Sequence, residues 1–288
     1  MKLARPDTFH PRIVLAGCPR HPAGGGDDAG LVTALRHRGL HARWLSWDNP
    51  EVANAHLVIL RATADYSARL DEFLAWSTSA QNLLNAPAVV AWNAERRYLG
   101  DLADRGVPTV PGEVFAPGNQ ARLPRTGHVF VSPTVGTGTR RCRDRAAAAA
   151  YIAEVHATGR SVFVQSGGSA RETVLVFLGG KPSHAFTPEG DTLREAEPEF
   201  EIWDVGAAAL ASAADRVGVE PGELLYARAD VVGDVADPRL LELQLVDPSL
   251  GWLQLDSKTR DLGQREFAVC VESALERLGL GPFSHRRP

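Results

Sequence analysis

Leu241-Glu242-Leu243-Gln244-Leu245 alternates apolar and polar residues, which is the period-two pattern of a half-buried β-strand. The leucines share one face of such a strand, so Glu242 and Gln244 share the other. In Arg228-Ala229-Asp230, the charged residues Arg228 and Asp230 likewise share a face. If these two strands are neighbours, two carboxylates and an amide oxygen converge, and Mg²⁺ prefers such oxygen ligands. A solvated sheet face carrying an Arg–Asp pair is the alternative.

Both strands lie in a long segment with the pattern of an α+β fold. From Trp92 onward, short apolar strands are interspersed with helices, with no internal repeat. Gly179-Gly180 lies between two strand-like runs, which predicts a two-residue hairpin turn. Asp247-Pro248-Ser249-Leu250 is by itself only a turn. The expected strands are 129–131, 162–165, 173–178, 183–187, 225–232 and 240–246, and the expected helices are 95–105, 144–156, 204–217 and 265–278.

The first ninety residues show strands and helices in strict alternation. Ile13 to Gly17 is a short apolar run consistent with a buried parallel strand, and a helix is expected from Leu31 to a closing Gly39. Further strands are expected at 41–45 and 57–60, followed by a helix and by a fourth apolar run at 88–91. This order predicts a small doubly wound parallel sheet, with ligands near the carboxyl ends of its strands.

The segment Gly24-x-Gly26-x-x-Ala29 fits a loose dinucleotide-binding fingerprint. However, its glycines begin seven residues after the strand, and Asp27-Asp28 would place two carboxylates where a pyrophosphate meets the helix N-terminus. A flexible loop with an aspartate cap fits the segment better. A nicotinamide-dependent enzyme is therefore kept only as a remote alternative.

A second glycine-rich loop runs from Thr134 to Arg140, after the strand expected at 129–131. The backbone N–H groups around Gly136 and Gly138 suit phosphate oxygens, and three arginines lie close by in the sequence. These two glycines are therefore candidate cofactor-binding residues. Gly-Thr turns are also common hairpin tips, and the P-loop motif G-x-x-x-x-G-K-[ST] does not occur.

The composition excludes several classes of protein. The 288 residues carry 31 Lys plus Arg and 35 Asp plus Glu, a formal charge of −4, so a strongly basic nucleic-acid binder is excluded. No window approaches the ~18 consecutive apolar residues of a membrane span, so a cytoplasmic protein without a membrane or nucleic-acid partner is expected. Three widely spaced cysteines without a C-x-x-C pair argue against a disulfide framework and a structural zinc site.

Taken together and in this order, the motifs resemble those of the ATP-grasp superfamily. The likeness is greatest to the branch with glutathione-synthetase-like ATP-binding domains that includes the O-ureidoserine cyclo-ligase of cycloserine biosynthesis. It runs from about residue 47 to 250. The motifs that carry it are Leu60-Arg61-Ala62-Thr63-Ala64-Asp65-Tyr66, Trp92-Asn93 with Arg96-Arg97-Tyr98-Leu99, Gly106-Val107-Pro108-Thr109-Val110-Pro111, Val129-Phe130-Val131-Ser132-Pro133-Thr134-Val135-Gly136, Phe163-Val164-Gln165, Arg171-Glu172-Thr173, Gly179-Gly180 with Ser183-His184-Ala185, Tyr226-Ala227-Arg228-Ala229-Asp230, and Glu242-Leu243-Gln244 with Asp247-Pro248-Ser249-Leu250.

The resemblance implies a two-part chain and an ATP-dependent reaction. A Rossmann-like pre-ATP-grasp domain is expected at residues 1–91 and a two-lobed ATP-grasp domain at 92–288, with its small lobe at about 125–166. In such ligases ATP phosphorylates a carboxylate, and an amine-type nucleophile then displaces the phosphate. ATP and Mg²⁺ are therefore the implied cofactors, and a small-molecule carboxylate and a nucleophile are the implied substrates. A homodimer is left open.

The resemblance also assigns roles to the strand-pair residues. Asp230, Glu242 and Gln244 would hold Mg²⁺, although Gln244 stands where the family has an acidic residue. An amide oxygen can still ligate Mg²⁺, so this replacement is mild. Arg228 would lie beside the phosphates as the catalytic residue.

Four further positions are assigned to the nucleotide by the same resemblance. Gln165 would lie on the hinge strand near adenine, and Glu172 would belong to the nucleotide or metal neighbourhood. Arg96 and Ser132 occupy the positions of two ATP-binding lysines. Arg96 keeps the charge as a planar fork, whereas Ser132 loses it.

The lost charge leaves two main hypotheses. Arg140, Arg141 and Lys181 are candidates to replace it, and spacing does not choose among them. With replacement, the chain is an active ATP-grasp ligase. Without it, the chain is a degenerate ATP-grasp pseudoenzyme with weak or no ATP turnover, acting as an interaction or regulatory protein.

Overall fold

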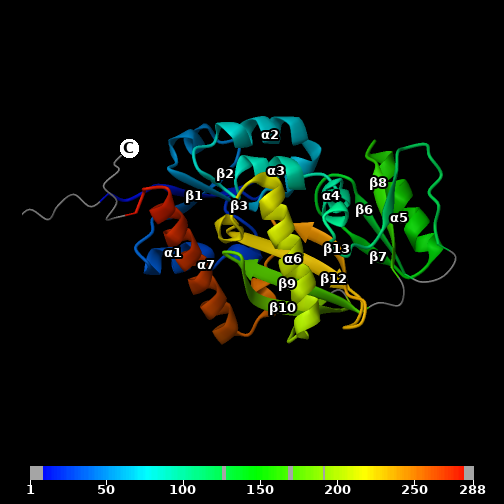
Figure 1. Cartoon of the computed structure of the whole chain (residues 1–288). Coiled ribbons are helices and arrows are strands. Elements are labelled where there is room, and N and C mark those ends of the chain that lie inside the picture. Colours follow the sequence, from blue (N-terminus) through cyan, green and yellow to red (C-terminus); the bar gives the residue numbers. More distant parts are fainter. Residues whose placement is uncertain (1–8, 125–127, 168–170, 191, 282–288) are drawn as a thin grey trace, which may run out of the picture.

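The alternating pattern of the N-terminal part forms the expected parallel sheet (Figure 1). The computed structural model describes residues 9–124, 128–167, 171–190 and 192–281. The strands of this sheet are β1 (Ile13–Gly17), β2 (Ala42–Ser46), β3 (Leu57–Ala62) and β4 (Leu83–Leu84), in the order β2-β1-β3-β4. Because neighbouring residues of β1 face opposite sides, α1 (Leu31–His37) packs on one face and α2 (Leu70–Ser79) on the other, so the doubly wound prediction is confirmed.

The apolar run at 88–91 is not a strand. It lies within helix α3 (Pro87–Asn93), and the fourth strand is the short β4 that precedes it. Pro87 suits the first turn of a helix, because its missing N–H would have no intrahelical partner there. Val89 and Val90 are both buried, but in two different clusters, so the run reads as uniformly apolar. Helix α4 (Tyr98–Asp104) follows.

A five-stranded antiparallel sheet forms the centre of the C-terminal part. Its strands are β9 (Glu172–Leu178), β10 (Lys181–Glu189), β11 (Thr192–Ala196), β12 (Tyr226–Val232) and β13 (Arg239–Gln244), in the order β11-β10-β9-β12-β13. Gly179 and Gly180, both with positive φ, form the predicted hairpin turn. Alternate β9 residues pack against α6 (Phe200–Val217) and α7 (Ser257–Arg277), on opposite faces of the sheet. No helix among the described residues is long and apolar enough to cross a membrane.

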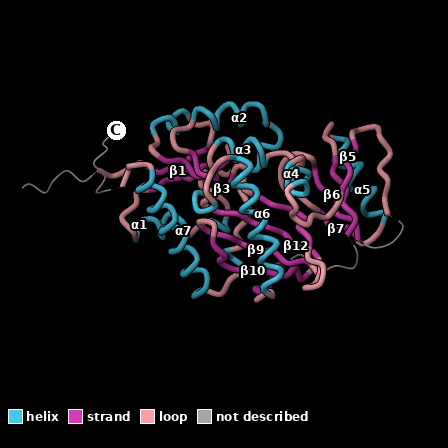
Figure 2. The backbone as a smooth tube through the Cα atoms, in the orientation of Figure 1, coloured by secondary structure: helices cyan, strands magenta, loops and turns pink. Residues whose placement is uncertain are grey.

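A smaller sheet lies at one end of the molecule, as Figure 2 shows. Its strands are β5 (Gly112–Phe115), β6 (His128–Pro133), β7 (Arg140–Cys142) and β8 (Val162–Gly167), in the order β5-β8-β6-β7. Helix α5 (Arg145–Ala157) covers one face and begins at the predicted cap, since the Asp144 carboxylate accepts from the Ala147 N–H at 2.8 Å. The other face, with Phe130, meets Leu241 of the five-stranded sheet.

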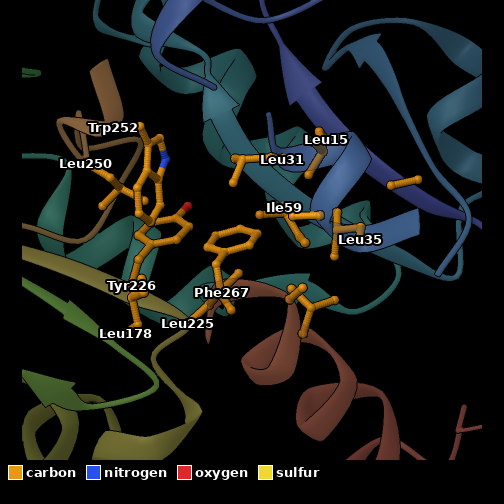
Figure 3. Close-up of a cluster of buried hydrophobic side chains, with 14 of the residues drawn as sticks. Leu15, Leu31, Leu35, Ile59, Leu178, Leu225, Tyr226, Leu250, Trp252 and Phe267 are labelled. Atoms are coloured by element: carbon orange, nitrogen blue, oxygen red, sulfur yellow. The ribbon is translucent and has the colours of Figure 1, made fainter. Parts of the chain in front are cut away.

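One buried cluster joins the parallel sheet to the five-stranded sheet (Figure 3). Leu15 and Ile59 of the parallel sheet lie in the same cluster as Leu178 and Phe267. The Tyr226 hydroxyl donates to the Leu60 carbonyl at 2.7 Å across this boundary. The two sheets are therefore held together by apolar burial and by a direct hydrogen bond. The domain division at residue 91, the cytoplasmic location and the homodimer stay predictions.

Candidate functional site

The two strands quoted first are neighbours, and their register brings the expected residues together. In the β12–β13 pair, Arg228 is opposite Gln244 and Asp230 is opposite Glu242. Directly opposed residues share a face of the sheet, so the four side chains form one patch. Asp230 and Glu242 are only 5% and 2% exposed. The alternative of a solvated sheet face is therefore wrong, although its Arg–Asp pair is present.

Each of the two buried carboxylates is paired with an arginine. Two nitrogens of the Arg228 guanidinium, Nε and Nη2, donate to the two carboxylate oxygens of Asp230, at 2.7 and 3.0 Å. Arg96 lies 2.7 Å from a carboxylate oxygen of Glu242, and both of these side chains are 3% exposed. Because such charges lose their hydration on burial, each carboxylate depends on its arginine for a compensating charge.

Arg96 reaches Glu242 because its segment is bound along the free edge of β13. The Asn93 side chain donates to the Leu243 carbonyl at 2.9 Å and accepts from the Leu245 N–H at 2.7 Å. The Tyr98 hydroxyl accepts from the Leu243 N–H at 3.0 Å. These side chains supply the hydrogen bonds that a further strand would otherwise provide. The motif from Trp92 to Leu99 is thus explained by the docking of this segment on β13.

The glycine loop of residues 134–139 folds over the same patch. Gly136 and Gly138 have φ of +85° and +118°, a region that L side chains rarely adopt. The Thr139 hydroxyl donates to the second carboxylate oxygen of Glu242 and accepts from Arg96 at 3.0 Å. Arg96 also donates to the Gly136 carbonyl at 3.4 Å. Both oxygens of Glu242 therefore have a partner, one from Arg96 and one from the loop.

Below this loop lies a cavity of about 360 Å³, into which most of the predicted metal and phosphate residues face. Glu172 joins the patch from β9, and burial together with the nearby Asp230 charge raises its pKa to about 7. Arg96 lines a separate, nearly filled space instead, with Tyr66 and Gly136. The residues that line the cavity are Thr137, Gly138, Thr139, Glu172, Arg228, Asp230, Glu242, Gln244, Asp247 and Ser249.

Ser132 and Gln165 lie apart from this cavity, on the face of the small sheet that meets the five-stranded sheet. They are 0% and 1% exposed. The Gln165 amide donates to the carbonyls of Val110 and Leu241, both at 3.1 Å, and so ties the two sheets together. Its side-chain oxygen and the Ser132 hydroxyl have no hydrogen-bond partner among the described residues. A buried polar atom without a partner is rare in folded proteins, and the predicted place of Gln165 near adenine stays a prediction.

Asp247 is a cavity residue that the sequence did not identify. Its carboxylate accepts from both the N–H and the hydroxyl of Thr63, a residue of the N-terminal part. Burial raises its pKa to about 7, and its φ of +50° is unusual for a residue other than glycine. The available signals were its position, three residues after Gln244, and its place in the family motif that ends with Asp247-Pro248-Ser249-Leu250, which was interpreted alone as a turn.

The raised pKa of Asp247 predicts a pH dependence of stability. The unfolded carboxyl titrates near ~4, so between about 4 and about 7 the folded chain binds a proton that the unfolded chain releases. Stability is therefore lost as pH rises through this window. Asp247→Asn keeps an oxygen to accept from Thr63 but cannot ionise. Thermal melts should show this variant gaining stability over the wild type at pH 8 but not at pH 5. Equal differences at both pH values, as expected for the exposed control Asp204→Asn, would contradict it.

The Gly24–Gly26 loop has structural contacts in place of a nucleotide site. Asp28 forms a buried ion pair with Arg61 at 2.9 Å. Asp27 accepts from the N–H groups of Gly251 and Leu253 at 3.1 and 2.9 Å. Neither aspartate caps α1, whose N-cap residue is Gly30, so that part of the expectation is wrong. The two carboxylates instead bind the loop to other parts of the chain.

Comparison with known proteins agrees with this geometry. A family model for the N-terminal domain of the D-cycloserine synthetase DcsG matches residues 13–85. The cycloserine biosynthesis protein DcsG of Streptomyces lavendulae is 30% identical over 257 residues, covering 76% of this chain and 86% of that protein. The chain belongs to the ATP-grasp superfamily. It is therefore related to ATP-dependent ligases, as its motifs indicated.

Two solved structures extend the ATP-grasp assignment to nearly the whole chain. The crystal structure of D-cycloserine synthetase DcsG matches with a TM-score of 0.74 at 27% identity, covering 93% of this chain and 99% of that one. The D-alanine–D-alanine ligase of Bacillus anthracis, solved with ATP, matches with a TM-score of 0.65 at 11% identity, covering 93% and 98%. At that identity the second match shows the fold alone.

Proposed function

We propose that this chain is an ATP-dependent ligase that binds the ATP phosphates and Mg²⁺ in the 360 Å³ cavity. The observation that carries the proposal is the convergence of Arg228, Asp230, Glu242 and Glu172 beneath the glycine loop. A cation, several hard oxygen ligands and a loop suited to phosphate are the parts that phosphoryl transfer requires.

The carboxylates fit a Mg²⁺ ion that arrives with the nucleotide. Within the described parts of the chain, no group of three or more His, Cys, Asp or Glu side chains could hold a metal by itself. Mg²⁺ is commonly bound by one or two carboxylates together with substrate phosphates. Asp230 and Glu242 would hold the ion, with Gln244 beside them. When bound, the ion would neutralise charge that develops on the phosphate oxygens.

The chain's own residues then account for orientation and charge. In the proposed reaction the bond between the γ-phosphorus and its bridging oxygen breaks, and a substrate carboxylate oxygen takes the phosphoryl group, giving an acyl phosphate and ADP. An amine then attacks the carbonyl carbon, phosphate leaves, and the amine loses a proton. Arg228 would bind the transferring phosphate, because phosphate oxygens can compete with Asp230 for its guanidinium. The glycine loop would exclude water from the cavity.

The substrates that we propose are small molecules. The DcsG relative is named a D-cycloserine synthetase, and the cavity of about 360 Å³ suits the reacting groups of a small carboxylate and an amine. Asp247 and Ser249 add oxygen acceptors at the side of the cavity nearest Thr63. This side would suit the protonated form of an amine.

Trapping of the activated carboxylate tests the proposal. The protein is incubated with Mg-ATP, hydroxylamine and pools of small carboxylic and amino acids, and hydroxamate and ADP are measured. Because hydroxylamine attacks acyl phosphates, we expect both products in equal amounts from at least one pool. Arg228→Gln should lower both rates by about 10- to 100-fold, since it removes a charged contact to phosphate. ADP without hydroxamate would contradict the acyl phosphate.

One observation favours the second candidate, a pseudoenzyme. Arg96 is buried and paired with Glu242, and Ser132 carries no charge. Neither residue therefore offers the phosphates the positive charge expected of a lysine at its position. A pseudoenzyme would bind Mg-ATP weakly or not at all and would release no ADP with any pool. The hydroxamate assay therefore separates the two candidates.

A further inference from the structure

The register of the small sheet shows which of the two arginines of β7, Arg140 or Arg141, faces the five-stranded sheet. In the β6–β7 pair, Arg141 is opposite Phe130 and Arg140 is opposite Val131. Val131 belongs to the cluster beneath α5, whereas Phe130 packs with Leu241 of the five-stranded sheet. Opposed residues share a face, so Arg141 lies on the face turned toward the five-stranded sheet.

The other two candidates for the missing charge lie elsewhere. The Arg140 guanidinium stacks on the Tyr151 ring of α5, 3.9 Å from its centroid, and pairs with Glu154 at 3.2 Å. Lys181 is opposite Leu178 at the far end of β9. That end lies about 20 Å along the strand from Glu172. Arg140 therefore interacts with residues of α5, and Lys181 lies too far from Glu172 to supply the missing charge.

Arg141 lines a groove of about 1070 Å³ between β7, α5 and the β10–β11 hairpin. Arg140 lines the same groove, but on its α5 side, where it contacts Tyr151 and Glu154. Thr139 and Glu172 line both this groove and the 360 Å³ cavity, so the two spaces adjoin each other. The Arg141 charge also acts on Glu172, whose pKa it lowers against the larger effect of burial. An extended anion could therefore contact Arg141 and Arg228 at the same time.

We propose that Arg141 binds the phosphate chain of ATP and supplies the positive charge that Ser132 lacks. This inference rests on the proposed function, because the groove adjoins the cavity assigned to the phosphates. Arg141 lies on the same face of the small sheet as Ser132, since both alternate with residues that pack beneath α5. A planar guanidinium can bind two phosphate oxygens at once.

Binding of a non-hydrolysable ATP analogue tests the proposal. Isothermal titration with AMPPNP and Mg²⁺ is compared for the wild type, Arg141→Gln and Arg141→Lys, with adenosine as a ligand without phosphates. Arg141→Gln should raise the Kd for AMPPNP by about 10- to 100-fold, the value of a charge-assisted contact. The Kd of Arg141→Gln for adenosine should stay within about twofold of the wild-type value. The Kd of Arg141→Lys for AMPPNP should lie between those of the wild type and Arg141→Gln.

Arg140→Gln is the matched control, because it removes the same charge from the opposite face of the same strand. Its Kd for AMPPNP should stay within about twofold of the wild type. The inference is overturned if Arg141→Gln binds AMPPNP as the wild type does, or if both glutamine variants weaken binding equally. It is also overturned if Arg141→Gln weakens adenosine and AMPPNP alike. A wild type that binds neither ligand would instead reject the proposed function.

Discussion

Arg96→Met is expected to lower the free energy of unfolding by about 3–5 kcal/mol, the cost of removing one partner from a buried ion pair. The variant leaves Glu242 buried, 2% exposed, with the Thr139 hydroxyl still donating to its carboxylate. Because Arg96 also bonds Gly136 and Thr139, the glycine loop loses a support as well. Urea denaturation without nucleotide, at neutral pH, measures the change.

The neighbouring Arg97 provides the control. It pairs with Glu95 at 2.7 Å, but its side chain is 83% exposed. Exposed pairs contribute about 0–1 kcal/mol, so Arg97→Met should be nearly neutral. Adding Glu242→Leu to Arg96→Met should recover most of the loss, because an apolar pair leaves no buried charge. If Arg96→Met costs no more than Arg97→Met, the buried pair does not stabilise the fold as described.

Glu242→Gln is expected to abolish the Mg²⁺-dependent part of the stabilisation by ATP. A ligand at a hundred times its Kd stabilises the folded state by about 2.7 kcal/mol. With Gln244 already an amide, an amide in place of Glu242 leaves Asp230 as the one charged ligand of the proposed set, and it also removes the carboxylate that pairs with Arg96. Each variant is therefore compared with its own nucleotide-free form, by thermal unfolding with ATP plus Mg²⁺ and with ATP plus EDTA.

Two further variants test whether the loss of the Mg²⁺-dependent shift is specific to the proposed metal site. Glu51→Gln changes an exposed carboxylate in the N-terminal part, paired with Arg43, and should leave the full Mg²⁺-dependent shift. Gln244→Ala removes a partly exposed residue of the proposed metal site without disturbing the buried pair and should reduce the shift. A full shift in Glu242→Gln would show that the metal binds without the Glu242 carboxylate.

Much of the fold could be predicted from local patterns. The strand Ile13–Gly17, the Gly179-Gly180 turn and the Asp144 cap each follow from residue types with a direct backbone consequence. The run at 88–91 was misassigned because apolar residues buried on two sides lose the period that separates a helix from a strand. Only the clusters that surround α3 settle its conformation.

The candidate site was predictable as a patch and unpredictable in its contacts. Alternation along β12 and β13 places Asp230 and Glu242 on one face, and the sequence required only that the strands be neighbours. The pairing of Arg96 with Glu242 depends on Asn93 and Tyr98 binding the edge of β13, which no local pattern reveals. The choice among the three candidate cations likewise required the strand register.

The pairing of Arg96 with Glu242 also links the glycine loop to the carboxylates. With a net charge of −4, the chain has no general surplus of cations, so phosphates must be bound by particular arginines. Arg228 is paired with Asp230 and Arg96 with Glu242. In the proposed complex, Arg228 would exchange Asp230 for a phosphate oxygen, which would leave the Asp230 carboxylate available to the metal.

A crystal structure with AMPPNP and Mg²⁺ would locate the phosphates and the metal directly. We expect a metal within about 2.1 Å of oxygens from Asp230 or Glu242 and from the phosphates, with Arg228 on a phosphate oxygen. A nucleotide bound elsewhere, or a metal that contacts neither carboxylate, would rule out the proposed site.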